Sequence, residues 1–299
     1  MSPATKSVSP VWLAATCYFI WGIVPLFYVP IHAFGAGAIE IIAHRSLWAA
    51  VWAGGAVFAA KQWPDVIGAL RVPYVRWMLL LSSLLVAINW GVYVWSVTSG
   101  HTIDAALGYY LMPLLNMAAG AALFRERVDN WGKAAIGLAA VGVAIETFAI
   151  GHLPWIALAV AVSFGGYGIV RKHLPVNALA GLFIETAYLF LPALIYVSWY
   201  EMHGHGHFFR APGNAVWLML TGPVTVLPLV LFSYAAKRLP LSTLGFIQFI
   251  GPTLTFAIGL AQGEPFSVTS GVSFAFIWLG AAVFAFGAWR RLRVVKVAA

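Results

Sequence analysis

Hydrophobic residues fall in ten blocks, each long enough to cross a lipid bilayer as a helix. A bilayer core of about 30 Å needs about 20 apolar residues in a helix, because each residue adds about 1.5 Å of rise. Only 9% of the residues are charged and the mean hydropathy is +0.89, values outside the range of water-soluble domains. The sequence therefore predicts an all-α integral membrane protein with ten transmembrane helices, near residues 11–30, 38–60, 73–97, 103–123, 131–149, 153–170, 177–200, 214–236, 242–262 and 268–289.

Lysine and arginine are concentrated in alternate gaps between these spans. With the N-terminus placed in the cytoplasm, 15 of the 17 basic residues fall on the cytoplasmic side, Arg210 falls outside, and Arg45 lies within a span. Membrane proteins retain basic residues on the cytoplasmic side. The pattern predicts a multi-pass protein with both termini in the cytoplasm, and it attributes the pI near 9.7 to membrane orientation and not to nucleic-acid binding.

The gaps between spans are too short to hold a soluble catalytic or nucleotide-binding domain, the longest being near residues 61–72 and 201–213. The sequence has no P-loop, dinucleotide-binding glycine pattern, paired-cysteine motif or nucleophile elbow. We therefore expect no cofactor and no ATP-driven pumping. The first apolar stretch has the length of a span and lacks the features of a cleavable signal, so we expect it to stay as the first helix.

An internal repeat divides the chain into two halves of five spans, residues 1–150 and 151–299. Matched positions are offset by 137 to 146 residues. Because five is odd, equivalent helices cross the bilayer in opposite directions, and inverted repeats of this kind are typical of secondary transporters. The matches are Trp21 to Val24 with Tyr167 to Val170, Leu107 to Tyr109 with Leu244 to Phe246, Glu126 with Glu264, and Gly142 with Gly280.

Pro113 and Pro252 occupy matching places in the two halves. A proline inside a helix leaves a backbone carbonyl without its hydrogen bond, which weakens the helix at that point. We expect these two prolines to act as hinges, although close packing of membrane helices also accounts for many individual Gly and Pro residues.

Polar side chains inside the spans are the candidates for a substrate site, because an ionisable group at the bilayer centre costs about 2.5 to 3.5 kcal/mol on insertion scales. One layer is expected about 10 Å below the outer surface and another about 10 to 12 Å above the inner surface. The outer layer contains His44, Arg45, Asn89 and Tyr110, and the inner layer contains Asn116, Glu185 and Gln248.

Arg45 and Glu185 occupy comparable places in the second helix of each half. They can form a pair, or they can bind the two ends of a zwitterion across a central cavity. The structural alternative is that Arg45 extends to the outer surface or forms a static salt bridge. His44 follows Glu40 by four residues, so the two share a helix face and could hydrogen-bond.

Aromatic pairs three residues apart, Tyr18 with Trp21 and Trp90 with Tyr93, could line a cavity that holds flat or cationic molecules. Contact with lipid is the alternative for each pair. The predicted external loop carries His203, His205 and His207 alternating with glycine. Alternating His and Gly can bind metal, but imidazoles on a loop without fixed geometry bind weakly, so we interpret this segment as a solvated loop and assign no metal site.

Taken together, these residues resemble the RarD-type branch of the EamA-like drug/metabolite transporters over essentially the whole chain. The histidine-rich loop is not part of the resemblance. The segments that carry it are Glu40 to Trp48, Asn89-Trp90 with Trp95 to Val97, Ala106 to Tyr110 with Pro113 and Asn116, Ser163 to Lys172, Glu185-Thr186, and Arg238 to Thr253.

The resemblance implies two inverted five-helix repeats in a bacterial inner membrane and a secondary transporter that exports or exchanges small metabolites or drugs, with amino acids or similar zwitterions expected first. From the residues themselves, Arg45 is expected to hold a carboxylate, and Glu185 an amine or a transported proton. The embedded carboxylates for proton coupling are Glu40, Glu146 and Glu185, and the first and third are preferred because Glu146 lies near the outer rim. A facilitative uniporter or channel-like permease is the first alternative. The second is a membrane-embedded enzyme using His44 and Glu185, for which the sequence supplies no nucleophile or metal constellation.

Overall fold

The computed structural model describes residues 9–124, 128–236, 238–239 and 247–297. These residues form eleven helices and no strand. The helices are α1 (Pro10–Ala33), α2 (Ala38–Ala59), α3 (Trp63–Arg71), α4 (Pro73–Thr98), α5 (Thr102–Phe124), α6 (Asn130–Ile150), α7 (Trp155–Lys172), α8 (Ala178–Met202), α9 (Pro212–Ala236), α11 (Ile250–Ala261) and α12 (Val268–Val297).

Seven of these helices are long and apolar enough to cross a membrane, and two shorter apolar stretches lie in α7 and α11. The described chain is therefore a multi-pass helical membrane protein. The ninth predicted span, 242–262, is helical from Ile250 to Ala261, and residues 240–246 lie outside the described residues. A count of ten crossings stays a prediction.

The segment 61–72, expected as a loop, contains helix α3 (Trp63–Arg71). Pro64 in its first turn suits a helix start, because the missing N–H is one that has no partner inside a helix. The helix is attached to α8 through Trp63, whose ring meets Phe183 edge-on at 5.2 Å, and through Asp65, which accepts a 2.5 Å hydrogen bond from the Asn177 side chain. The expectation of a loop was wrong here, because a helix of nine residues is too short to show a clear helical repeat of hydrophobic residues in the sequence.

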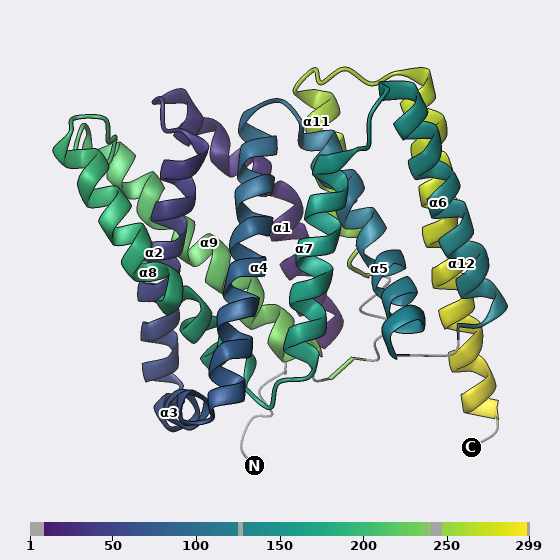
Figure 1. Ribbon diagram of the computed structural model, residues 1–299, viewed down its shortest axis with the longest axis horizontal. Coiled ribbons are helices and arrows are strands. Elements are labelled where there is room, and N and C mark those ends of the chain that lie inside the picture. The colour runs from purple at the N-terminus through teal and green to yellow at the C-terminus, as the bar shows by residue number, and fades with distance from the viewer. Residues whose placement is uncertain (1–8, 125–127, 237, 240–246, 298–299) are drawn as a thin grey trace, which may run out of the picture.

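The long helices stand side by side, and the described loops between them alternate between the two ends of the bundle (Figure 1). We call the end that carries α3 the α3 face and the other end the opposite face. Segments 60–72 and 173–177 lie at the α3 face, and segments 34–37, 99–101, 151–154, 203–211 and 262–267 lie at the opposite face. The five segments at the opposite face contain one lysine or arginine, Arg210.

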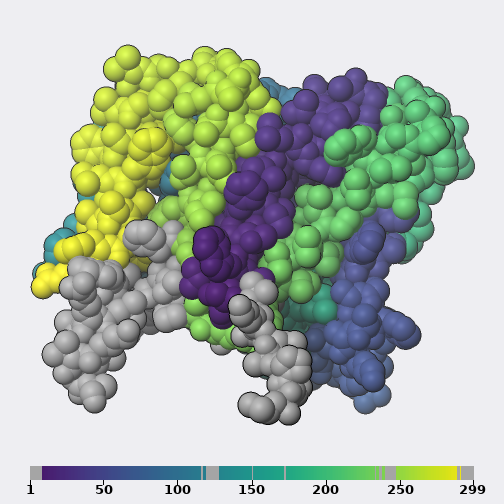
Figure 2. Space-filling model, turned by 180° about the vertical axis from the view of Figure 1, so that it is seen from behind, coloured from purple at the N-terminus to yellow at the C-terminus, as the bar shows by residue number. Residues whose placement is uncertain are grey.

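Helix contacts follow a pattern that survives exchange of the two halves. Five helices of the first half are matched in order with five of the second: α1 with α7, α2 with α8, α4 with α9, α5 with α11 and α6 with α12. Replacing each helix by its match turns the pair α5–α7 into α11–α1, and both pairs are in contact. The same holds for α4–α7 with α9–α1 and for α2–α9 with α8–α4, while α2–α8 and α6–α12 exchange into themselves. Figure 2 shows α1 crossing the back of the molecule between α9 and α11.

Glycines permit the closest of these approaches. A Cβ at Gly142 on α6 would lie 2.8 Å from the Ser273 carbonyl oxygen of α12, and a Cβ at Gly280 on α12 would lie 2.9 Å from the Ala135 carbonyl oxygen of α6. Both distances are below a normal van der Waals contact, so a side chain at either place would push the helices apart. These two glycines are one of the matched pairs of the sequence repeat.

The two predicted hinge prolines have different positions. Pro113 lies inside α5, whereas Pro252 lies in the first turn of α11. In a first turn the missing N–H costs no helical hydrogen bond. Pro113 therefore has the mid-helix position that a hinge needs. Pro252 lies at the start of the described helix and not in its middle.

Candidate functional site

Arg45 is buried among hydroxyl groups and an indole ring. Its Nε donates to Thr225 Oγ1 at 2.9 Å and its Nη1 donates to the Tyr28 hydroxyl at 3.0 Å. The guanidinium lies over the Trp90 ring, with Cζ 4.3 Å from the ring centroid. These contacts hold the cation by neutral acceptors and a cation–π interaction and leave part of its donor fork unused.

Asn89, next to Trp90 on α4, links the Arg45 region to α5 and α7. Its side-chain nitrogen donates to the Val160 carbonyl at 3.1 Å, and its oxygen accepts from the Tyr109 hydroxyl at 3.1 Å. The Tyr109 ring packs edge-on against Tyr93 at 5.7 Å. A polar and aromatic layer therefore continues from Arg45 into the α4–α5–α7 interface.

Glu185 on α8 is completely buried and fully partnered. Its carboxylate forms an ion pair with Arg171 Nε at 3.6 Å and accepts hydrogen bonds from Ser82 Oγ and from the Tyr167 hydroxyl, the latter at 3.3 Å. Ser83 Oγ donates to the backbone carbonyl of Glu185 at 2.8 Å. This network joins α4, α7 and α8 near the α3 face.

Arg45 and Glu185 therefore do not pair with each other in this structure. Glu185 is occupied by Arg171, and among the described residues no carboxylate forms an ion pair with Arg45. Arg45 also does not extend to the surface, since 8% of it is exposed. The static Arg45 salt bridge considered from the sequence is thus absent from the described part of the chain.

His44 and Glu40 lie on one face of α2, but they do not form the hydrogen bond that their spacing allows. Within the described part of the chain both ring nitrogens of His44 are without a hydrogen-bond partner, and its ring stacks on Phe208 with centroids 5.1 Å apart. Glu40 instead accepts from the backbone N–H of His207 and contacts its Nδ1, each at 2.8 Å. The spacing of four residues correctly predicted that the two side chains share a helix face. It could not predict that the Glu40 carboxylate would bind His207 instead.

Three further predicted site residues, Tyr18, Trp21 and Tyr110, lie in two separate groups. Tyr18 and Trp21 on α1 pack edge-on at 5.4 Å, and both contact Phe232 of α9. Tyr110 on α5 hydrogen-bonds Thr253 at 2.6 Å and stacks on Phe249 at 6.0 Å. The first group lies at the contact between α1 and α9, and the second lies where α5 meets α11. In both groups the rings pack against other protein side chains.

Gln248 is half-buried in the turn before α11. Asn116 belongs to α5, but its side chain lies outside the described residues, as do Glu126 and Leu244 to Phe246 of the sequence repeat. Their predicted roles stay predictions.

Sequence reasoning missed the partners of both buried charges. Tyr28 and Thr225 were not singled out, because they lie 17 and 180 residues from Arg45. Arg171 was counted among the cytoplasmic basic residues, since it ends a span. One signal could have found it: a fully embedded acid such as Glu185 requires a cation or several donors within reach.

Several proteins are similar to this chain over almost its full length. An uncharacterized transporter of Vibrio cholerae is 39% identical over 274 residues, which are 91% of this chain and 90% of that protein. Protein RarD of Streptomyces exfoliatus is 37% identical over 278 residues (92% and 88%), and Protein RarD of Escherichia coli is 38% identical over 288 residues (94% and 95%).

No family model matches the chain. A crystal structure of a protein 20% identical superposes with a TM-score of 0.59 over 95% of this chain and 98% of that chain, which supports the overall fold. The extent and identity of the curated relatives decide the family. The chain belongs to the RarD-type branch of the EamA-like drug/metabolite transporters.

Proposed function

We propose that this protein is a secondary active transporter of small carboxylate-bearing metabolites, such as amino acids or similar zwitterions, working as an exporter or exchanger by alternating access. The two inverted halves, residues 1–150 and 151–299, would rock against each other around a site near the bilayer midplane. The exchange of helix contacts between halves and the reciprocal Gly142 and Gly280 contacts support this arrangement.

The observation that carries the proposal is the buried Arg45, which has no carboxylate partner among the described residues. An arginine inside a membrane protein is costly unless its charge is balanced, and such residues mark substrate pathways. Guanidinium groups bind carboxylates through two parallel hydrogen bonds, and Arg45 uses two donors on Thr225 and Tyr28. A substrate carboxylate at the remaining donors would balance the charge, and Trp90 would stack on the same cation.

Glu185 is the proposed proton-coupling group. Protonation would remove its charge and so weaken the ion pair with Arg171, which ties α7 to α8 near the α3 face. Loss of that pair would loosen one side of the bundle, as alternating access requires. An amine of the substrate would compete with Arg171 for the same carboxylate.

The α3 face is proposed to be cytoplasmic, in a bacterial inner membrane. Lys61, Arg71 and Arg76 lie at or beside this face, whereas the described loops of the opposite face carry Arg210 alone. This asymmetry follows the positive-inside pattern. Both chain ends would then be cytoplasmic.

Proteoliposome counterflow tests the function. Vesicles preloaded with one unlabelled amino acid or zwitterion should accumulate the labelled compound, and an imposed pH gradient should raise the rate. Arg45→Gln should lower the rate at least 10-fold. Arg76→Gln is the matched control, because Arg76 is an exposed arginine of a neighbouring helix.

A folded Arg45→Gln protein that exchanges at the wild-type rate would contradict the proposal. Flux without saturation or counterflow would favour the permease alternative, and a product of changed mass would favour the enzyme alternative.

A further inference from the structure

The opposite face holds a compact group of metal-ligating side chains that the transport proposal does not use. Glu40 and His44 on α2 and Glu201 on α8 each offer one ligand atom, and these atoms lie within 4.8 Å of one another. Glu40 and His44 are each 2% exposed. Neither ring nitrogen of His44 has a hydrogen-bond partner among the residues that the structure describes, although the ring is buried and reaches into the group. A buried imidazole without a partner is costly, and a bound ion or water would relieve that cost.

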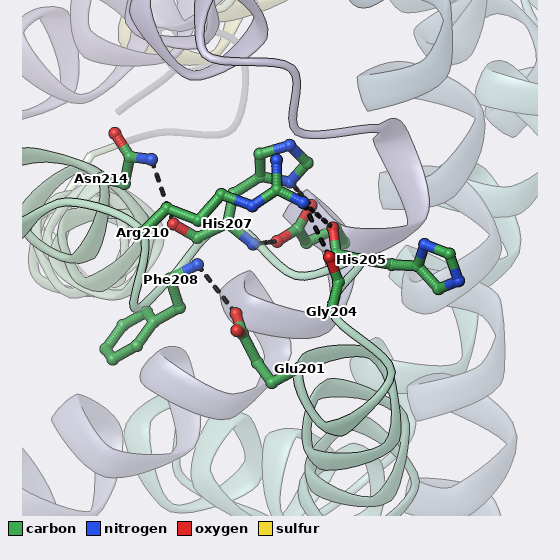
Figure 3. Close-up of polar contacts among 8 residues, drawn as sticks. Glu201, Gly204, His205, His207, Phe208, Arg210 and Asn214 are labelled. Carbon is green, nitrogen blue, oxygen red and sulfur yellow. Dashed lines mark hydrogen bonds and ion pairs between the residues drawn. The ribbon is translucent and has the colours of Figure 1, made fainter.

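Residues of the loop between α8 and α9 contact and orient both carboxylates. Glu201 accepts from the backbone N–H of Phe208 at 2.8 Å (Figure 3), and Glu40 is held by the backbone N–H and the ring of His207. A Cβ at Gly206 would fall within 2.6 Å of every atom of the Glu201 carboxylate, so only glycine permits this approach. Each carboxylate oxygen has two lone pairs and keeps capacity for another ligand.

These contacts resemble the hydrogen bonds that orient the ligands of a metal site. Metal-ligating carboxylates are usually hydrogen-bonded themselves, and those bonds fix their orientation. The Phe208 ring, stacked on His44 and on Trp48 at 6.0 Å, fixes the imidazole plane in the same way. The three ligands thus come from two helices that the loop holds together.

We propose that Glu40, His44 and Glu201 bind a divalent transition-metal ion, with Zn²⁺ as the probe ion and water at the fourth position. Imidazole nitrogen and carboxylate oxygen are both ligands that this class of ion takes in proteins, and the two negative charges balance its charge. With bonds of about 2.1 Å, tetrahedral ligand atoms lie about 3.4 Å apart. The group must therefore contract, and Glu201, the most exposed member at the membrane rim, supplies the movement.

The other histidines of the loop lie outside this group. The His203 ring bonds to the Trp199 carbonyl oxygen at 2.8 Å and is exposed, and the exposed His205 ring points away from Glu201 and His207 in Figure 3. Metal held by a mobile histidine tract would use these rings. The proposed site would instead tie α2 to the end of α8.

The test uses the full-length protein with an affinity tag that contains no histidine, purified in detergent and stripped of metal with a chelator. Zn²⁺ titration against a chromogenic competitor should show one tight ion per chain. Glu201→Gln should weaken that binding at least 10-fold, because the amide keeps the size of the side chain and the hydrogen bond from Phe208 but loses the charge. His203→Ala/His205→Ala is the matched control and should bind as the wild type does.

Co²⁺ provides a second readout, since coordination by His44 and carboxylates gives visible absorption that Glu201→Gln should reduce. Binding unchanged in Glu201→Gln, binding lost in the His203/His205 variant, or no tight ion in the wild-type protein would each overturn the proposal.

Discussion

Arg45 on α2 and Glu185 on α8 are both buried charges on helices that pack against each other, yet their surroundings differ. Glu185 has a cation and hydroxyl donors on its carboxylate, whereas Arg45 has hydroxyl acceptors and one aromatic ring. Removing one partner of a buried ion pair lowers the free energy of unfolding strongly, because it leaves the other charge buried without a counter-ion. A charge held without a counter-ion is available for a ligand. The comparison assigns the substrate carboxylate to the Arg45 region, and it gives the Glu185 region an ion pair that stabilises the fold until the proposed protonation weakens it.

The largest expected effect on stability comes from removing the cation beside Glu185. Arg171→Leu leaves a completely buried carboxylate without its ion-pair partner and should lower the free energy of unfolding by about 3 kcal/mol at pH 8. Unfolding in mixed detergent micelles measures it. The double variant Arg171→Leu/Glu185→Leu should recover most of the stability; no recovery would mean that the pair is not the cause.

A second effect comes from a helix contact outside both regions. It shows how large a stability loss packing alone can cause, for comparison with the loss of a charged partner. Gly142→Val should cost about 2 kcal/mol, because its Cβ would lie 2.6 Å from Ile277 Cγ1 in the α6–α12 contact. Gly137→Val, on the same helix with open space around it, is the control. The same unfolding assay applies to both, and equal losses would show that this contact does not limit the approach of the helices.

Tyr167→Phe should have a smaller effect, about 1 kcal/mol, since it removes one hydrogen bond to Glu185 and leaves the ion pair intact. The ring contact with Phe164 at 5.6 Å is kept. Unfolding of the variant beside wild type provides the measurement. A loss as large as that of Arg171→Leu would make Tyr167, and not Arg171, the main partner of Glu185.

The smallest effect on stability is expected at Arg45. Arg45→Gln removes an unbalanced buried charge together with two hydrogen bonds, so the two terms offset and the net change should stay below about 1 kcal/mol. A loss above that of Arg171→Leu would reverse the comparison and make Arg45 a structural residue.

The sequence predicted the helical class and the positions of most helices, because long apolar blocks have one stable form in a bilayer. It also selected Arg45, Asn89, Trp90 and Glu185 as embedded polar or aromatic residues. It did not predict α3, whose nine residues are too few for a clear period.

Partner choice was the part that the sequence could not supply. Arg171 ends its helix beside Lys172 and looked like an ordinary cytoplasmic basic residue, while its reach to Glu185 depends on how α7 packs on α8. His207 looked like one of three equivalent loop histidines, but it is the buried one, and it binds Glu40. Such assignments depend on tertiary contacts between distant segments, and spacing along the chain does not encode them.

The most direct test of the central claim is the thermal stabilisation of the purified protein by matched pairs of ligands, each an amino acid and its amide without a free carboxylate. The account predicts a shift with at least one carboxylate compound, none with its amide, and loss of the shift in Arg45→Gln but not in Arg76→Gln. Equal shifts with acid and amide, or a shift retained in Arg45→Gln, would contradict the assignment of Arg45 to the substrate carboxylate.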